Sequence, residues 1–213
     1  MSRTIGLTRR LVKGSPLTAT DHDANLDLIE TDLGDDLIFD MLASVASAPV
    51  PNQNAPTIAD FGPAHTPQRR ERRFDIGDYV FIDPFHVNHD IKPGGRAWAH
   101  VHWSSNGSNT GLVAWELTIM RALGHNQANF EAPTVLTIEQ AGAGSAWRHM
   151  IVEASDPQAL TLFEPDELIM ITLRRVAPSA GSNADQIFAI QVDFHYEMDR
   201  RGTPNKAPDF YGD

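Results

Sequence analysis

The feature that most constrains this chain is a series of strand-like segments that begins at Phe74. From there to Met198, short segments rich in β-branched and aromatic residues alternate with turn-forming stretches such as SSNGSNTG and APSAGSNADQ. We predict seven strands, at residues 78–82, 96–103, 112–122, 134–140, 146–154, 167–177 and 186–198. Because no helical pattern separates them, this texture favours a mainly β fold, an antiparallel β-sandwich of jelly-roll type.

The last predicted strand, 186–198, alternates in character. Every second residue from Phe188 to Met198 is apolar, whereas the residues between them include Gln191, Asp193 and His195. A strand directs successive side chains to opposite faces of its sheet. We therefore expect the face from Phe188 to Met198 to belong to the core.

An amphipathic helix is predicted for residues 18–45. Apolar side chains recur there at steps of three and four residues, with acidic residues mostly between them; the apolar positions are Leu26, Ile29, Leu33, Leu37, Met41 and Val45. Thr20 or Asp21 can cap its start, and Gly34 weakens it locally. A lone helix cannot bury its own apolar stripe, so it must pack on its own domain, on copies of itself or on another protein.

The segment 46–73 contains five prolines, at positions 49, 51, 56, 63 and 67. Proline is incompatible with a helix interior and with a central strand, so we predict a linker or an arm that runs extended over a surface. The expected organisation is then an N-terminal arm and helix (1–45), this linker, a β-sandwich domain (74–199) and an extended C-terminal tail (200–213).

The net charge of the chain indicates which kinds of partner it can bind. With 17 Lys and Arg against 28 Asp and Glu, the formal net charge is −11, which argues against nucleic acid as a partner. Basic residues do cluster locally, and we interpret them as solvated loop charge or, alternatively, as a docking site for an acidic partner; they are Arg9, Arg10, Lys13, Arg69, Arg70, Arg72 and Arg73. No segment has the apolar length of a signal peptide or a membrane span, so we expect a soluble protein made in the cytoplasm.

His100 and His102 are the candidates for a metal site. In a strand, the two imidazoles of AHVHW point to the same side and can chelate one ion, but further ligands are needed. Those available on other strands are His149, His195 and Glu197. There are no cysteines, which excludes thiolate ligands, disulfides and cysteine nucleophiles.

The cupin barrels offer one metal-dependent comparison. Their first motif is a glycine, five residues, His-x-His and then a glutamate, and the gap from Gly94 to His100 matches it. Asn106 and Gly107 stand where the glutamate should be, and no second motif follows. A second arrangement would join one His-x-His pair from each chain of a trimer around a threefold axis. The favoured interpretation is that no metal or cofactor is bound and that the histidines are interior or interface residues.

Other catalytic patterns are missing from the sequence, including the nucleophile elbow, the phosphate loop, the dinucleotide fingerprint and the His-Glu-x-x-His helix. We therefore predict no catalytic residues and no enzymatic activity. The acidic turn at Glu164, Asp166 and Glu167 is interpreted as solvated charge rather than a glycosidase pair. The tryptophans, at 98, 103, 115 and 147, fall in predicted strands, where core packing is their more frequent role and an exposed one could bind sugar.

Two stretches resemble virion proteins of tailed bacteriophages. LVKGSPLTATDHDANLDLI, residues 11–29, resembles the N-terminus shared by many fibre and virion proteins, in which a Lys-Gly-x-x-Leu-Thr turn leads to a short helix with Asp-Ala-Asn. AHVHWSSNGSNTGLVAWELTI and DFHYEMDRRGT are similar to a family of small phage proteins of mostly unassigned role. In the first family this segment attaches to the particle. The resemblance therefore implies an attachment role for Arg10, Lys13, Leu17, Asp23, Asn25, Leu26, Ile29 and Leu33.

The resemblance implies a non-enzymatic virion structural protein, assembled in the host cytoplasm as a homotrimer, with capsid or tail proteins as partners and no nucleic acid or membrane partner. We favour a capsid decoration or cement protein, because the chain has no long shaft and no separate tip domain. The alternative is a short tail or neck appendage. Alternatives of other classes are a cupin-like metal-dependent enzyme that uses His100 and His102, and a carbohydrate-binding module.

Overall fold

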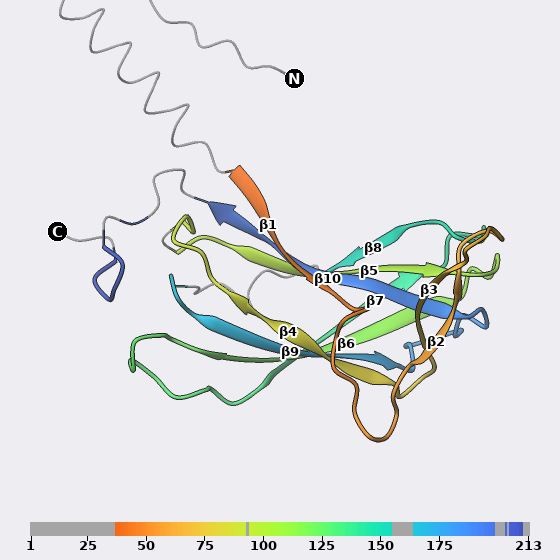
Figure 1. The fold of residues 1–213 in the computed structure, drawn as a ribbon, viewed down its shortest axis with the longest axis horizontal. Coiled ribbons are helices and arrows are strands. Elements are labelled where there is room, and N and C mark those ends of the chain that lie inside the picture. Colours follow the sequence, from red (N-terminus) through yellow and green to blue (C-terminus); the bar gives the residue numbers. More distant parts are fainter. Residues whose placement is uncertain (1–36, 93, 155–163, 199–202, 204, 211–213) are drawn as a thin grey trace, which may run out of the picture.

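A computed structural model describes residues 37–92, 94–154, 164–198, 203 and 205–210. Ten strands form two antiparallel sheets that lie face to face (Figure 1). These residues contain no α-helix, and hence none with the length and apolar character to cross a membrane. The predicted fold class, an antiparallel β-sandwich of jelly-roll type, is confirmed.

The first sheet, sheet A, has the order β2-β3-β10-β5-β8, and β1 also pairs with β10; sheet B has the order β4-β9-β6-β7. The strands of sheet A are β1 (Leu37–Ser44), β2 (Thr57–Phe61), β3 (Arg69–Phe74), β5 (Ala97–Ser105), β8 (Met150–Glu153) and β10 (Ile187–Met198). Those of sheet B are β4 (Tyr79–His86), β6 (Leu112–Ala122), β7 (Thr134–Ala141) and β9 (Leu168–Val176). All seven strands predicted after Phe74 are present, with shifted ends.

The core lies between the two sheets. Trp103 of β5 and Trp115 of β6 are both fully buried there, and the Phe74 ring meets that of Trp115 edge-on at a centroid distance of 5.4 Å. At another point, Phe85 of β4 meets Phe194 of β10 at 5.0 Å. Burial of these large apolar side chains from both sheets is the main force that holds the sandwich closed.

β1 occupies the end of the predicted helix 18–45. It pairs with β10 along its whole length, and Met41, Ala43 and Val45 are buried. The helical prediction for 37–45 was wrong, because apolar residues at steps of four share one face of a strand as well as one face of a helix. The remainder of the predicted helix lies outside the described residues.

The proline-rich segment 46–73 also contains strands, so the prediction of a strandless linker was wrong. β2 and β3 form a hairpin there, and β3 also pairs with the first residues of β10. All five prolines lie before β2 or in the loop between β2 and β3, where no ladder hydrogen bond is lost. The sandwich therefore begins at β1 rather than at Phe74.

The arginines of β3 contact the chain itself, which corrects the interpretation of loop charge. Arg72 donates from Nε to the Val45 carbonyl at 3.0 Å and from Nη2 to the Ala48 carbonyl at 2.8 Å. Arg69 donates to the buried Glu71 carboxylate. The contacts of Arg72 tie β3 to the loop that follows β1.

A bulge in β10 changes the pattern predicted for the last strand. Its register with β5 shifts between Ala189 and Gln191. As a result Ala189 faces the core together with Val192, while Phe188 faces the other side and contacts Phe61 at 5.3 Å. The strict alternation that placed Phe188 on the core face was wrong, because an extra residue reverses the facing of every residue before it.

Candidate functional site

Sheet A carries a group of histidines and carboxylates on the face that points away from sheet B. Ala99 and Val101 of β5 are buried in the core, and strand geometry therefore directs His100 to the opposite face. In β10, Val192, Phe194 and Tyr196 are buried in the core, so Asp193 and His195 point in the same direction as His100. The registers then place His100 opposite Asp193, and His195 opposite Asp40 of β1.

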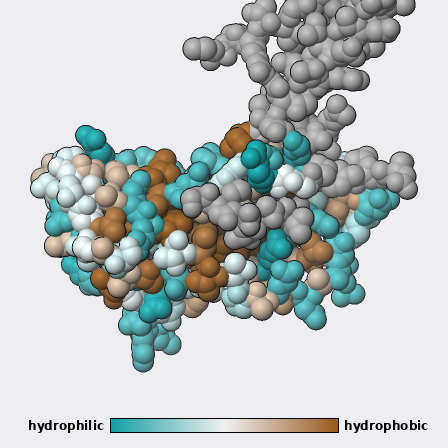
Figure 2. Space-filling model, turned by 180° about the vertical axis from the view of Figure 1, so that it is seen from behind, coloured by the Kyte–Doolittle hydropathy of each residue, from teal (hydrophilic) through white to brown (hydrophobic). Residues whose placement is uncertain are grey.

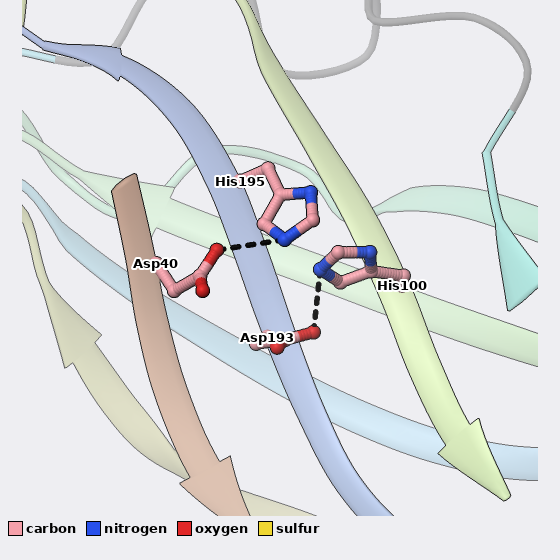
Figure 3. A group of neighbouring side chains, drawn as sticks. All are labelled: Asp40, His100, Asp193 and His195. Carbon is pink, nitrogen blue, oxygen red and sulfur yellow. Dashed lines mark ion pairs between the residues drawn. The ribbon is translucent and has the colours of Figure 1, made fainter. Parts of the chain in front are cut away.

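Four of these side chains converge on one point (Figure 3). His100 Nε2 lies 2.7 Å from Asp193 Oδ1, and His195 Nε2 lies 2.7 Å from Asp40 Oδ1. The two imidazoles meet edge to face with centroids 3.8 Å apart. One ligand atom from each of Asp40, His100, Asp193 and His195 lies within 4.8 Å of the other three. Three adjacent strands thus supply two nitrogens and two oxygens at a single place.

The group is buried on one side and open on the other. His100 and Asp193 are 1% and 2% exposed, whereas the side chains of His195 and Asp40 are 34% and 47% exposed. Both ring nitrogens of His100, and Oδ1 of Asp193, are buried without a hydrogen bond, although His100 Nε2 and Asp193 Oδ1 form an ion pair at 2.7 Å. Buried polar atoms normally have partners, so these three call for an explanation.

Further polar groups surround the four side chains. Glu153 Oε2 of β8 lies 3.5 Å from Nδ1 of both His100 and His195. The second oxygen of Asp193, Oδ2, accepts hydrogen bonds from His102 Nε2 at 3.0 Å and from Gln191 Nε2 at 3.3 Å. The two carboxylate oxygens of Asp193 therefore contact different groups: Oδ1 faces His100, and Oδ2 faces His102 and Gln191.

The pKa of Asp193 reflects this position. Burial alone raises the pKa of this carboxyl, but the neighbouring imidazoles of His100 and His102 outweigh it and hold the pKa at about 2. The carboxylate is thus ionised at neutral pH. Because Nε2 of His102 donates to Asp193, Nδ1 of a neutral His102 accepts from His149 Nε2 at 2.7 Å.

The structure separates the two histidines of the His-x-His motif. His100 belongs to the convergent group, whereas His102 is turned to His149. A cupin-like site built from this pair is therefore not what the geometry offers. The threefold-axis arrangement needs imidazoles directed at other chains, and His100 is buried against Asp193 of its own chain.

Of the additional ligands suggested by the sequence, only His195 joins the group. Glu197 is instead paired with the Arg96 guanidinium and accepts the Arg96 backbone N–H at 3.0 Å. Sequence reasoning missed Asp40, which it placed in a helix, and Asp193. The spacing of Asp193 and His195 on one strand, which repeats that of the His-x-His pair, was the signal that could have found the second. The predicted attachment residues, Arg10 to Leu33, lie outside the described residues.

The tryptophans divide into two pairs. Trp103 and Trp115 are fully buried, in line with the expected core role. Trp98 and Trp147 are half-buried, and each ring is contacted by a neighbour: the Arg96 guanidinium carbon lies 5.2 Å from the Trp98 ring, and Phe61 meets Trp147 edge-on at 5.4 Å. Neither ring is a bare platform of the kind a sugar would stack on.

A second cluster surrounds Asp166, in the turn before β9. Its carboxylate lies 3.3 Å from His86 Nε2, 3.0 Å from His89 Nε2 and 2.6 Å from His125 Nε2. Hydrogen bonding, above all from His125, lowers the pKa of Asp166. Phe210, from the predicted C-terminal tail, is buried against the His89 and His125 rings. The turn was expected to be solvated, and this was wrong for Asp166.

Within the described ranges, only the Asp40 group has metal-type ligand atoms that converge.

Comparisons with known proteins yield structural neighbours only. No protein-family description matches the chain. No curated protein matches it either. Among solved structures, a β-1,3-glucan-binding CBM6 from Bacillus halodurans is 10% identical with a TM-score of 0.35, covering 71% of this chain and 92% of its own. A CBM35 from Cellvibrio japonicus Abf62 is 14% identical with a TM-score of 0.35, covering 72% and 92%. The CBM36-1 domain of a multidomain xylanase from the hindgut metagenome of Trinervitermes trinervoides is 12% identical with a TM-score of 0.33, covering 73% and 96%. These sequence identities and TM-scores are too low to indicate what this chain binds.

Proposed function

We propose that the chain is a non-enzymatic structural protein of a tailed-bacteriophage virion, attached through its N-terminal segment. The support from sequence is the resemblance of residues 11–29 to virion attachment segments and of the strand motifs to a small phage family. The support from structure is a single compact β-sandwich whose first strand, β1, begins at Leu37, on the C-terminal side of that segment in the sequence.

The strongest structural support for this proposal is the exposed edge of β1. Within the described part of the chain it pairs only with β10, so its other edge is open. Ile38, Phe39 and Leu42 of β1 are 50%, 51% and 61% exposed. Hydrophobic residues also reach the surface on the face drawn in Figure 2. An open edge strand with exposed apolar side chains is a surface on which another chain docks.

We favour a capsid decoration or cement protein, assembled as a homotrimer, with a short tail or neck appendage as the alternative. Copy number distinguishes the two, because decoration follows the many equivalent positions of the shell, whereas a tail appendage occurs in about a dozen copies. A quantified protein gel of virions that contain the chain gives this number. For the trimer, light scattering should give a mass three times 23.5 kDa.

The attachment test compares the full chain with residues 37–213, which retain every described strand. Both are added to virions that lack the protein. The full chain should bind and the shortened one should not, although its circular dichroism remains that of a β protein. Leu42→Asp should weaken binding, while Ile58→Asp, at an apolar position of β2 that is 46% exposed, should not. Absence of the protein from virions, or undiminished binding of residues 37–213, would contradict the proposal.

A further inference from the structure

We propose that Asp40, His100, Asp193 and His195 bind one divalent transition-metal ion, with zinc as the best fit, and that this ion fastens β1 and β5 to β10. The inference does not depend on attachment to a virion. It differs from the sequence-based expectation that no metal is bound. The structure does not test that expectation, and the experiment below does.

The ligand set suits such an ion. Two imidazole nitrogens and two carboxylate oxygens form a mixed set without sulfur, typical of zinc and its neighbours rather than of calcium or magnesium, which prefer oxygen alone. The two positive charges of the ion balance the two carboxylates. Because four protein ligands complete a tetrahedral shell, the site has the closed form of a structural metal centre.

Two buried atoms of the site that lack a hydrogen bond point to the same conclusion. His100 Nε2 and Asp193 Oδ1 are buried and face each other at 2.7 Å without a hydrogen bond. Around a tetrahedral zinc with bonds of about 2.0–2.1 Å, neighbouring ligand atoms are about 3.3 Å apart. Separation of the two side chains by roughly half an ångström therefore admits the ion and gives both atoms a partner.

The surroundings orient the ligands as metal sites require. Histidine ligands commonly donate their second ring N–H to a carboxylate, which fixes the tautomer. Here one oxygen of Glu153 is an ion-pair neighbour of Nδ1 of both His100 and His195 at 3.5 Å, and a hydrogen bond made from this position would leave both Nε2 atoms for the ion. On Asp193, contacts from His102 and Gln191 occupy Oδ2 and leave Oδ1 for the ion.

The site is also accessible. Asp40 and His195 are 47% and 34% exposed at their side chains, so an ion can enter from the β1 side without unfolding. Its ligands come from β1, β5 and β10, and β1 is otherwise held in the sheet by pairing with β10 alone among the strands that the structure describes. A bound ion would therefore stabilise this edge of the sheet in particular.

The test uses the full chain without an affinity tag, stripped with a chelator and titrated with Zn²⁺ by calorimetry. The wild type should bind one equivalent, and its thermal midpoint should rise with the free zinc concentration. His195→Ala and Asp40→Asn, at partly exposed positions that do not disturb the core, should abolish this binding. Glu153→Gln, which alters only the orienting carboxylate, should weaken it about 10- to 100-fold.

His149→Ala is the matched control, because His149 lies on the same region of the surface but outside the ligand set, and it should bind zinc like the wild type. Cobalt(II) substitution supplies a spectroscopic readout, since a tetrahedral site gives intense visible absorption that His195→Ala should lack. The proposal is overturned if the wild type shows no saturable binding, or if His149→Ala loses as much affinity as His195→Ala.

Discussion

Glu167 is a carboxyl group with little access to solvent. It is 2% exposed, and it lies at a pocket of about 170 Å³ that Arg121 also lines. Arg121 Nε is 3.5 Å from Oε1, and the Glu164 backbone N–H donates to Oε2 at 3.2 Å. Burial nevertheless outweighs these contacts and raises the pKa of Glu167 to about 7. The expectation that this turn is solvated was also wrong for Glu167, whose side chain is buried directly before the first residue of β9.

This raised pKa has a consequence for stability. A carboxyl whose pKa is higher in the folded state contributes stability fully below its unfolded value of 4.5, and that contribution is lost as the pH rises through about 7. Glu167→Gln cannot ionise, so it should unfold at nearly the wild-type temperature at pH 5 but be more stable by about 1–3 kcal/mol at pH 8. Thermal unfolding at both pH values measures this.

Glu164→Gln is the control, because Glu164 is exposed in the same turn and its charge is the smallest of the causes that raise the pKa of Glu167, so this variant should show a much smaller difference between the two pH values. Equal stabilisation of Glu167→Gln at pH 5 and pH 8 would mean that ionisation of Glu167 is not the cause.

At the scale of the element, β1 decides where the domain begins. Its buried residues Met41 and Ala43, together with Val45 directly after it, belong to the common core, and its backbone completes one edge of sheet A. An N-terminal deletion that ends at residue 45, chosen from the sequence as a domain boundary, removes this strand. One that ends at residue 36 keeps it.

The two deletions should therefore behave differently. Residues 37–213 should unfold with a midpoint close to that of the full chain. Residues 46–213 should be less stable by about 3 kcal/mol or more, because buried apolar side chains are lost and the edge of β10 is uncovered. Urea unfolding followed by circular dichroism measures both. If residues 46–213 proved as stable as residues 37–213, β1 would have no part in the fold.

For the whole molecule, polar contacts fix how the two sheets face each other. Trp103 of β5 donates from Nε1 to Gln140 Oε1 of β7 at 2.9 Å. Arg175 of β9, 5% exposed, donates from Nη1 to the Phe74 carbonyl of β3 at 2.7 Å. Apolar burial is not directional, whereas these hydrogen bonds are, so they select one alignment of the sandwich.

Replacement of Trp103 tests this link. Trp103→Phe removes the donor to Gln140 and part of a fully buried ring, and should destabilise the protein by about 1–3 kcal/mol. Trp115→Phe, at an equally buried position of the core whose ring N–H has no hydrogen bond, should cost less. Guanidinium unfolding of both variants provides the comparison, and equal losses would show that the contact between the sheets adds nothing beyond hydrophobic area.

The seven strands after Phe74 and the class of fold could be predicted from the amino-acid sequence alone, because alternation and turn residues are local properties that can be read without knowledge of the partner strand. The sequence did not determine β1, whose apolar spacing fits a helix and a strand equally well. It also did not reveal β2 and β3, because the prolines that flank these strands and the charges of β3 resemble those of a linker.

The candidate site could be identified only once the strands had been placed next to one another. His100 stood out in the sequence, but its partner on the same strand, His102, is not in the group. Its actual companions are Asp40, Asp193 and His195, more than half the chain apart at the extremes. They meet because β10 pairs with β1 on one side and with β5 on the other, in registers that the bulge and the packed core determine. Register between distant strands depends on how both faces are buried, and that is a property of the assembled sandwich rather than of any one segment.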